Sequence, residues 1–322
     1  MKILLAGGAG YIGSSLVPAL LERGYAITVV DLLWFGNHLP AGVTVIQKDV
    51  FHLQEGDLKG FDEVVFLAGL SNDPMAEFSP SKNFISNAAA PAYLAYLAKR
   101  AGTRRYIYAG SCSVYGYTVN ELYHEGSPAV SQYPYGISKL QGEQAAMQLR
   151  GDGFSVICFR QGTVSGYSPR MRLDLIVNTM FKTAMQKGEI VVNNPSIWRP
   201  ILSIEDAVSA YVRAVEASEE ISGVFNVASG NYTVGEVADV VKSHIEDKLK
   251  RKVKLTIKHL QDYRNYKVSI EKAVNVLSFK PRHTVGSIVE HLILHADQFK
   301  DFDNPAYYNI RVFESLEAEQ KA

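Results

Sequence analysis

The feature of this 322-residue sequence that most constrains its fold is a glycine-rich turn near the start. The apolar run from Ile3 to Ala6 has the character of a short strand buried on both faces. Gly7, Gly10 and Gly13 follow it in the spacing G-x-x-G-x-x-G, and an apolar-periodic segment comes next. Such glycines let the backbone approach a pyrophosphate closely, and the amides that open the following helix bind the anion. The sequence therefore predicts a dinucleotide-binding strand–turn–helix unit.

A glycine-rich turn alone is a weak signal because it could be an ordinary loop. Here a second strand is predicted over residues 26–30, and it ends in Asp31, about twenty residues past the glycines, where dinucleotide-binding folds carry an acid. A carboxylate at that place accepts hydrogen bonds from a ribose 2′-hydroxyl and repels a 2′-phosphate. We therefore predict NAD, rather than NADP, as the cofactor.

Charge and cysteine content exclude several classes of partner. The chain carries 33 basic and 33 acidic residues, so its net charge gives no indication that it binds a nucleic acid or a membrane surface. Its two cysteines, Cys112 and Cys158, are too few for a disulfide framework and fit a reducing compartment. No run of apolar residues is long enough to span a bilayer. We therefore expect a cytoplasmic protein.

Strands and helices alternate through the first half of the sequence. This order predicts an α/β fold with a doubly wound parallel sheet. Ligands bind such sheets beyond the carboxyl ends of the strands, so the residues that follow each strand are candidates for a site. The further predicted strands are 43–46, 63–69, 105–110 and 155–160, and the predicted helices are about 11–23, 82–100 and 135–150.

The composition shifts after Gln161, where a loop rich in Gly, Ser and Arg begins. We take this loop as the start of a second, smaller lobe. The predicted domains are 1–165, which binds the dinucleotide, and 166–322, mainly a C-terminal α/β lobe for the substrate, with residues of about 200–228 returning to the first domain. The tail after Asn304 is polar, and we expect it to be frayed.

The segment after the fifth predicted strand carries the residues for alcohol–ketone chemistry. Tyr135 and Lys139 lie four residues apart and so share one face of a helix, and Ser111 follows the strand. A phenol titrates near 10, but an ammonium group one turn away and a positive nicotinamide ring would stabilise the phenolate. In isolation, such a pair is more often an ordinary surface pair of a helix. Its place in a nucleotide-binding fold favours oxidoreduction without a metal.

These motifs together resemble the extended short-chain dehydrogenase/reductase family, with its NAD-binding Rossmann domain. Within that family they look most like the nucleotide-sugar epimerases and dehydratases, typified by UDP-galactose 4-epimerase. The resemblance covers almost the whole chain, to about Pro281. It is carried by GGAGYIG (7–13), Asp31, Asp49-Val50, SCSVYG (111–116), YPYGISK (133–139) and WRPILSIEDAV (198–208).

The resemblance implies a role for each matching residue. Tyr135 would be the catalytic base, Lys139 its modulator and a ribose ligand, and Ser111 the third catalytic member. Arg199 and Arg264 resemble arginines that pair with a substrate diphosphate, a role that suits guanidinium groups. The residues expected to bind NAD are Gly7, Gly10, Tyr11, Ile12, Gly13, Asp31, Asp49, Val50, Leu67, Asn87, Tyr135 and Lys139, and those expected to bind substrate are Ser111, Thr163, Arg199 and Arg264.

Departures from the family pattern narrow the reaction. Sugar dehydratases of this family carry an Asp-Glu pair after the catalytic hydroxyl, and decarboxylases keep a Glu there. This chain has Cys112 and Ser113 instead, and neither supplies a carboxyl group. The resemblance then implies an NAD-dependent nucleotide-sugar 4-epimerase that acts by transient oxidation at C4. The alternative is a nucleotide-sugar 4-dehydrogenase or 4-ketoreductase with the same site.

Three further expectations concern residues outside that core pattern. Cys112 is more often a packing residue than a nucleophile at such a place. His291 and His295 lie four apart on the last predicted helix, but no third ligand is evident, so we predict a solvated face and no metal site. Relatives commonly pair through helices equivalent to 82–100 and 135–150, which implies a homodimer. The small faces compatible with pairing, or equally with burial in a monomer, contain Ala88, Ala92, Ala95, Ala145 and Ala146.

Overall fold

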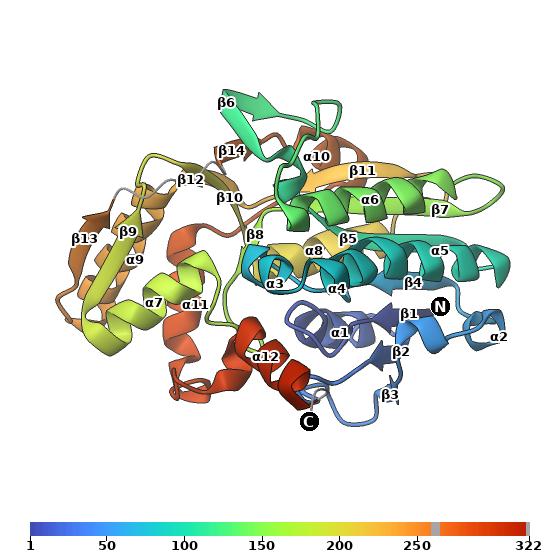
Figure 1. The fold of residues 1–322 in the computed structure, drawn as a ribbon, viewed down its shortest axis with the longest axis horizontal. Helices are drawn as coiled ribbons and strands as arrows, with labels where there is room; N and C mark the ends of the chain where they lie inside the picture. Colours follow the sequence, from blue (N-terminus) through green and yellow to red (C-terminus); the bar gives the residue numbers. More distant parts are fainter. Residues whose placement is uncertain (259–264, 320–322) are drawn as a thin grey trace.

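A seven-stranded parallel sheet forms the centre of the protein, in a computed structural model that describes residues 1–258 and 265–319 (Figure 1). From β1 the chain adds β2 and β3 on one side, then crosses back to add β4, β5, β7 and β11 on the other. The predicted doubly wound α/β fold is confirmed. In sheet order the strands are β11 (Gly223–Val227), β7 (Ser155–Gln161), β5 (Arg105–Ser111), β4 (Glu63–Phe66), β1 (Lys2–Ala6), β2 (Ala26–Asp31) and β3 (Thr44–Gln47).

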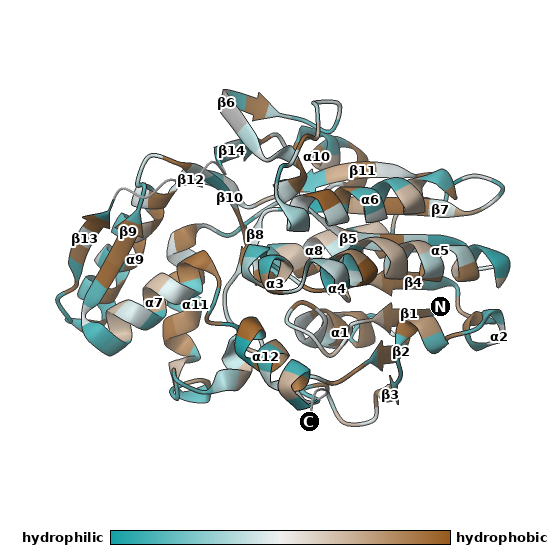
Figure 2. Cartoon of the chain, viewed as in Figure 1, coloured by the Kyte–Doolittle hydropathy of each residue, from teal (hydrophilic) through white to brown (hydrophobic). Residues whose placement is uncertain are grey.

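Helices cover both faces of this sheet. On one face, α1 (Gly13–Leu21), α8 (Ile204–Val215) and α10 (Glu271–Leu277) pack apolar side chains onto the strands. On the other face lie α2 (Glu55–Leu58), α5 (Ala90–Arg100) and α6 (Pro134–Gln148). Figure 2 shows the resulting pattern, with hydrophobic colours on the central strands and hydrophilic colours on the outer turns of the helices. Burial of apolar surface on both faces of the sheet provides the main stabilisation of this domain.

The helix predicted over residues 82–100 is interrupted by a π-helical turn. The structure has α4 (Pro80–Phe84), a π-helical segment (Ile85–Ala89) and then α5. The wider turn places Asn87 in the interior, where its Nδ2 donates to the carbonyl of Leu70 at 2.8 Å. Such π turns occur frequently at functional sites. This one fixes the loop that follows β4.

A second lobe contains its own hydrophobic core. Apolar residues of three helices meet there with those of two short strands that pair in parallel. A three-stranded sheet, β12–β10–β8, joins this lobe to the first domain. The helices are α7 (Ile176–Lys187), α9 (Val234–Leu249) and α11 (Val285–Leu294), and the strands are β8 (Thr163–Ser165), β9 (Glu189–Asn193), β10 (Trp198–Ser203), β12 (Gly230–Thr233) and β13 (Lys254–Lys258).

The remaining elements are short. A parallel pair, β6 (Tyr117–Tyr123) and β14 (Asn265–Val268), lies beside β10 (Figure 1). Helix α3 (Asp73–Phe78) follows β4, and 3₁₀ turns occur at Val50–His52, Cys112–Tyr115, Ala296–Gln298 and Pro305–Tyr307. Among the residues that the structure describes, none of the helices has the length and apolar character needed to cross a membrane.

The segment after Asn304 does not fray as expected. Residues Asn309–Glu319 form helix α12, which returns to the first domain and contacts α3. Phe313 is buried in a small cluster with Leu70 and Met75, so an apolar anchor holds the segment in place. The prediction relied on the polar composition of the tail and gave no weight to Phe313. Helix α10 also returns to the first domain, beyond the predicted 200–228.

Candidate active site

Two adjoining cavities of about 310 and 370 Å³ form one cleft at the carboxyl edge of the large sheet. This is the place where doubly wound sheets bind ligands. The residues that line both cavities are Gly7, Gly10, Phe35, Leu67 and Gly69. The shared wall therefore comes mainly from the glycine-rich turn after β1 and the loop after β4.

The glycine-rich turn meets the requirements for close approach of a ligand. Gly7 has φ +78°, and a Cβ atom there would lie 2.4 Å from the backbone nitrogen of Ala68. Gly13 lines neither cavity. A Cβ atom there would lie 2.3 Å from the carbonyl oxygen of Gly8, so the close packing at this position requires glycine. It lets α1 pack tightly against the turn. Ile12 precedes α1 without a side-chain cap and lines the smaller cavity, so the start of α1 borders that cavity. The amides of Ser14 and Ser15 donate to the carbonyls of Gly10 and Ile12.

The larger cavity contains the acids expected to bind the adenosine half of a dinucleotide. Asp31 accepts hydrogen bonds from the backbone amides of Ala9 at 3.0 Å and Leu33 at 2.8 Å. Burial raises the pKa of its carboxyl group, and these two amides act in the opposite direction. Asp49 and Val50 line the same cavity. A carboxylate held by two amides, beside a mainly apolar chamber, fits a ribose and its base.

Asn87 supports the cleft from behind and does not line either cavity in the described residues. Its side chain is buried between the loop after β4 and Asn83, to whose Oδ1 it donates at 2.8 Å. A Cβ atom at Gly69 would lie 2.3 Å from the Oδ1 atom of Asn87. The amide thus holds Gly69 close to the cleft, which requires glycine there.

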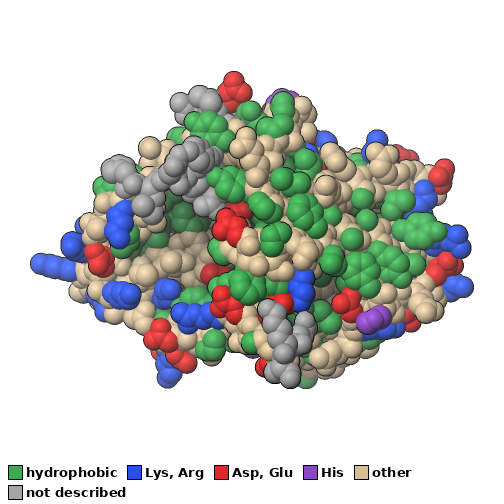
Figure 3. All heavy atoms as spheres, viewed as in Figure 1, with side chains coloured by type: hydrophobic (Ala, Val, Ile, Leu, Met, Phe, Trp, Pro, Cys, Tyr) green, Lys and Arg blue, Asp and Glu red, His purple; other side chains and the backbone are tan. Residues whose placement is uncertain are grey.

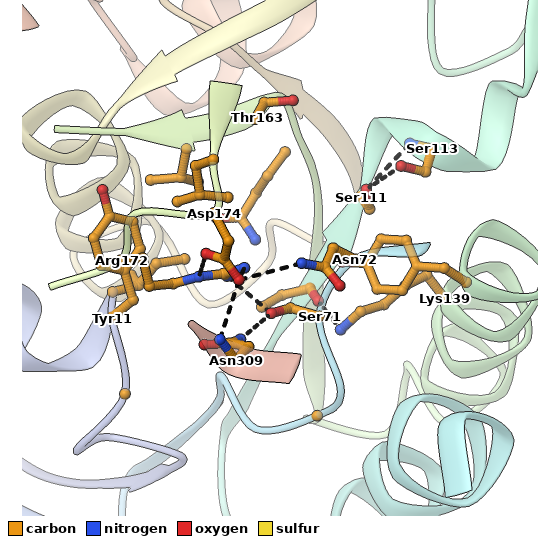
Figure 4. A pocket seen from close by; sticks show the side chains of 18 of the residues that line it. Tyr11, Ser71, Asn72, Ser111, Ser113, Lys139, Thr163, Arg172, Asp174 and Asn309 are labelled. Atoms are coloured by element: carbon orange, nitrogen blue, oxygen red, sulfur yellow. Dashed lines mark hydrogen bonds and ion pairs between the residues drawn. The ribbon is translucent and has the colours of Figure 1, made fainter. Parts of the chain in front are cut away.

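The smaller cavity brings Ser111, Tyr135 and Lys139 together, as Figure 4 shows for the first and last of them. Ser111 ends β5, and its Oγ accepts from the amide of Ser113 at 3.1 Å. Tyr135 and Lys139 come from the first two turns of α6 and line the same cavity as Ser111. The Lys139 ammonium group donates to the carbonyl of Ala109 at 3.0 Å. Two chain segments, the end of β5 and the start of α6, therefore converge on one hydroxyl-rich corner.

The electrostatics of this corner differ from the expectation. Burial, and then the negative charge of Asp73, raise the pKa of Tyr135 above its usual range, against the positive charge of Arg172. Burial also lowers the pKa of Lys139 to about 7, so its positive charge is partly lost at neutral pH. The expected lowering of the phenol pKa by the neighbouring ammonium group is therefore absent in the protein alone. A further positive charge at the site is needed to favour the phenolate.

The expected substrate residues lie on the opposite wall. Thr163 of β8 and Arg199 of β10 line the smaller cavity. The Arg199 side chain is 9% exposed, and its guanidinium carbon lies 5.7 Å from the ring centroid of Tyr266. Arg264 lies outside the described residues, so its expected contact with a diphosphate stays a prediction.

A buried polar network in the same cavity was not foreseen. Arg172 pairs with Asp174 through two hydrogen bonds of 2.8 and 3.1 Å and donates to Ser71 at 2.8 Å (Figure 4). Asn309 donates to the same Ser71 oxygen at 2.8 Å and accepts from Arg170 at 2.5 Å. The Gly-, Ser- and Arg-rich loop after Gln161 is a usable sequence signal for Arg170 and Arg172. Asn309 carries no local signal, because it reaches the cleft through a helix far along the chain.

The network leaves positive charge at the cleft. Arg170 and Arg172 are buried, at 2% and 6% exposure, and both line the smaller cavity with Asp174. Burial and the charge of Arg172 lower the pKa of Arg170 to about 9. The Arg170 guanidinium group also lies 3.7 Å from the ring centroid of Phe35. This donor set suits a phosphate group.

Cys112 and the two histidines take no part in the site. Cys112 is 1% exposed, its Sγ donates to the carbonyl of Arg160 at 3.1 Å, and burial raises its pKa, so the thiol packs in the interior. His291 pairs with Glu205, and His295 stacks on Tyr167 with ring centroids 4.2 Å apart. Both histidines are half-buried, so the face predicted to be solvated is only partly so. Within the described ranges, no group of three or more His, Cys, Asp or Glu is placed to hold a metal.

Comparisons with known proteins agree with this geometry. Residues 3–228 match the model of the NAD dependent epimerase/dehydratase family. The chain is 26% identical over 311 residues to UDP-glucose 4-epimerase of Corynebacterium glutamicum, covering 90% of this chain and 94% of that enzyme. It is 28% identical over 299 residues to UDP-glucuronic acid decarboxylase 1 of Arabidopsis thaliana, covering 88% of this chain and 66% of that protein.

A solved structure shows the same fold. UDP-glucuronic acid 4-epimerase of Bacillus cereus, in complex with UDP-glucuronic acid and NAD, superimposes with a TM-score of 0.79 at 22% identity, covering 92% of this chain and 99% of that one. The matched family model spans the glycine-rich turn, Asp31 and the Ser111, Tyr135 and Lys139 cluster. The chain is therefore an enzyme of the NAD-dependent epimerase/dehydratase family, with NAD as its cofactor.

Proposed function

We propose that this enzyme is a nucleotide-sugar 4-epimerase that oxidises C4 of a nucleoside-diphosphate sugar transiently. The observation that supports this proposal is the convergence of Ser111, Tyr135 and Lys139 on one corner of the cleft. Bound NAD supplies the hydride acceptor and donor. Tyr135 takes and returns the proton of the C4 hydroxyl, and Ser111 hydrogen bonds the same oxygen. Lys139 keeps the phenol oriented through the helical turn they share.

The residues after Ser111 favour epimerisation over elimination or decarboxylation. Cys112 is buried away from both cavities, and Ser113 donates its amide to Ser111. Neither group can serve as the carboxylic acid that relatives use for proton transfer at C5 or C6. Asp73 and Asp174 also line the smaller cavity, and Asp174 is engaged by Arg172. The proposal therefore requires that the hydrogen on C5 of the sugar does not exchange with solvent during turnover, as it would in elimination or decarboxylation.

A nucleoside-diphosphate sugar fits the charge distribution of the cleft. Arg199 and Thr163 lie on the wall formed by the second lobe, and Arg170 and Arg172 lie between the lobes. Guanidinium groups bind diphosphates through paired hydrogen bonds. The names of the relatives above contain UDP-glucose and UDP-glucuronic acid, so uridine nucleotides head the panel of candidates. The expected cytoplasmic location and homodimer stay predictions.

The test is incubation of the purified enzyme with a panel of UDP-, dTDP- and GDP-sugars in D₂O, without added NAD, followed by NMR. We expect C4 epimers to equilibrate without deuterium at C4 or C5, because the hydride returns to the carbon from which it came. Net accumulation of a 4-keto sugar or of NADH would support the dehydrogenase or ketoreductase alternative. Deuterium at C5 with loss of water or CO₂ would contradict epimerisation and support elimination or decarboxylation.

A further inference from the structure

Helix α12 lies across the cavity that contains Asp31 and Asp49. Phe313, Leu316 and Glu317 of this helix line that cavity. The family model ends at residue 228, so the helix belongs to a part of the chain that the model does not match. Helix α12 contacts α3, and Figure 1 shows it below α3, although its residues are among the last in the sequence.

The cavity beneath α12 is the place for the adenosine half of NAD. Asp31 and Asp49 mark the ribose position in this fold, whereas Ser111, Tyr135 and Lys139 line the other cavity, where the nicotinamide reacts. Trp34, Phe35, Phe51, Ile85 and Phe313 give the larger cavity a mainly apolar, aromatic lining. Such a lining suits a purine ring.

Three sets of contacts hold α12 in place, one near each end and one in the middle. At its start, the backbone amide of Asn309 donates to Asp174 at 3.2 Å, and its side chain joins Ser71 and Arg170. Near its end, Glu317 pairs with Lys82 of α4, and both residues line the cavity.

The central contact is apolar. Phe313 is 2% exposed, and its ring centroid lies 5.9 Å from those of Trp34 and Phe78. Trp34 follows β2 and Phe78 ends α3, so one aromatic ring connects α12 to the loop after β2 and to α3. The helix is thus fixed by a buried anchor and two polar contacts.

We propose that α12 is a clamp that encloses the adenosine end of NAD and limits its release. Phe313 is the anchor of the clamp, the Lys82–Glu317 pair fastens its end, and the helix must separate from Trp34 and Phe78 before the cofactor leaves. The proposal depends on the NAD site and holds for any reaction at C4. It also couples the two cavities, because Asn309 belongs to the polar network around Arg172 in the catalytic cavity.

The test measures release of NAD. The enzyme is loaded with NAD, freed of excess cofactor by gel filtration, and mixed with an enzyme that consumes free NAD, so that the rate of loss reports release. We expect Phe313→Ala to release NAD at least about tenfold faster than the wild type, which corresponds to about 1.4 kcal/mol. We expect the release rate of Phe313→Leu to lie between those of the wild type and Phe313→Ala, because leucine keeps part of the buried side chain. ADP-ribose, which lacks the nicotinamide, is expected to show the same order when its release is followed by dilution.

Ser315→Ala is the matched control, because Ser315 is exposed on the same helix and lines neither cavity. We expect it to release NAD at the wild-type rate. Thermal unfolding of each cofactor-free variant checks that it folds, and Glu317→Gln, which removes no packing volume, provides a second variant, expected to release NAD faster than Ser315→Ala. Equal release rates for the wild type, both Phe313 variants and Glu317→Gln would overturn the clamp. Failure of the epimerase proposal would instead show in the sugar products and leave these rates unchanged.

Discussion

At the scale of single residues, burial shifts the pKa values of Tyr135 and Lys139 in opposite directions, and both shifts favour the neutral form of the side chain. Burial raises the pKa of Tyr135 and lowers that of Lys139 to about 7. A neutral phenol beside a partly neutral amine is a stable resting arrangement and a poor base. Arg172 already acts to lower the pKa of Tyr135, and a positive charge close to the phenol would act in the same direction. Under the proposed function, proton transfer by Tyr135 thus needs both the protein and the bound cofactor.

Tyr135→Phe tests the role of the phenol. Removal of a general base typically lowers a rate by about 10²–10⁴-fold, and we expect a loss of epimerisation in this range. The phenyl ring keeps the packing of the first turn of α6, so NAD binding and thermal stability should stay close to the wild type. Tyr117→Phe is the control, because Tyr117 is 52% exposed and lies outside the cavities. Turnover of Tyr135→Phe within about tenfold of the wild type would contradict a role as the base.

Lys139→Met tests the lowered pKa of the lysine through stability. An unfolded lysine titrates near 10.4, whereas the folded group titrates at about 7, so between these values the unfolded chain binds more protons at this site. The free energy of unfolding of the cofactor-free enzyme should therefore rise with pH across this window, by up to a few kcal/mol. We expect Lys139→Met to reduce that slope, measured by urea unfolding at several pH values.

The matched control for the lysine experiment is Lys280→Met, since Lys280 is exposed. It should keep the slope of the wild type. If Lys139→Met and the wild type show the same dependence on pH, Lys139 is charged in the folded enzyme at neutral pH, and its ammonium group is then available to the phenolate.

At the scale of elements, the active site depends on how closely α6 approaches the π-helical segment. A Cβ atom at Gly142 would lie 2.3 Å from the carbonyl oxygen of Asn87 and 2.7 Å from the hydroxyl of Tyr108. Tyr108 also donates to the carbonyls of Asn87 and Lys139, at 3.0 and 3.3 Å. The glycine thus sets the distance between the helix that carries Tyr135 and Lys139 and the turn that supports Gly69.

Gly142→Ala should destabilise the enzyme although alanine is the better helix former. The added methyl group has to push α6 away from Asn87, and overpacking of this kind costs about 1–3 kcal/mol, more than the gain of about 1 kcal/mol in helix propensity. Gly56→Ala is the control, because a Cβ atom at Gly56 of α2 meets nothing within 4 Å. We expect urea unfolding to show a loss for Gly142→Ala and no loss for Gly56→Ala; a stabilised Gly142→Ala would show that the two helices separate freely.

The sequence predicted the parts of this fold that have local signals. Buried strands such as β1 consist of consecutive apolar residues, and the spacing of Tyr135 and Lys139 on one helix is visible without a structure. The π turn at Asn87 has no such signal, since it arises from the contact with Leu70 and the close approach of Gly142. Likewise, the place of Asn309 depends on contacts more than a hundred residues away along the chain.

At the scale of the whole molecule, the catalytic cavity lies between two lobes that each have a hydrophobic core. Tyr11 of the first domain donates its hydroxyl to the carbonyl of Gly166 at 2.6 Å, and Ser14 and Ser168 hydrogen bond at 2.8 Å. These contacts join the lobes directly behind the glycine-rich turn. A substrate that contacts both lobes will therefore add contacts to those that already join them, and its binding will raise the free energy of unfolding of the enzyme.

The expected homodimer can be tested on the outer face of α5. Ala95 and Ala146, which the sequence left open as dimer contacts, are buried within the monomer. Tyr96 is 50% exposed, and Figure 3 shows apolar side chains gathered over the helices that include α5 and α6.

If this face pairs with a second copy, Tyr96→Glu buries a charge at the interface and should raise the dimer dissociation constant by at least about 100-fold, or about 2.8 kcal/mol. Light scattering after gel filtration measures the mass, and Leu294→Glu, at a side chain 76% exposed on α11, should leave it unchanged. A wild-type enzyme that runs as a monomer, or a dimer that survives Tyr96→Glu, would contradict pairing through this face.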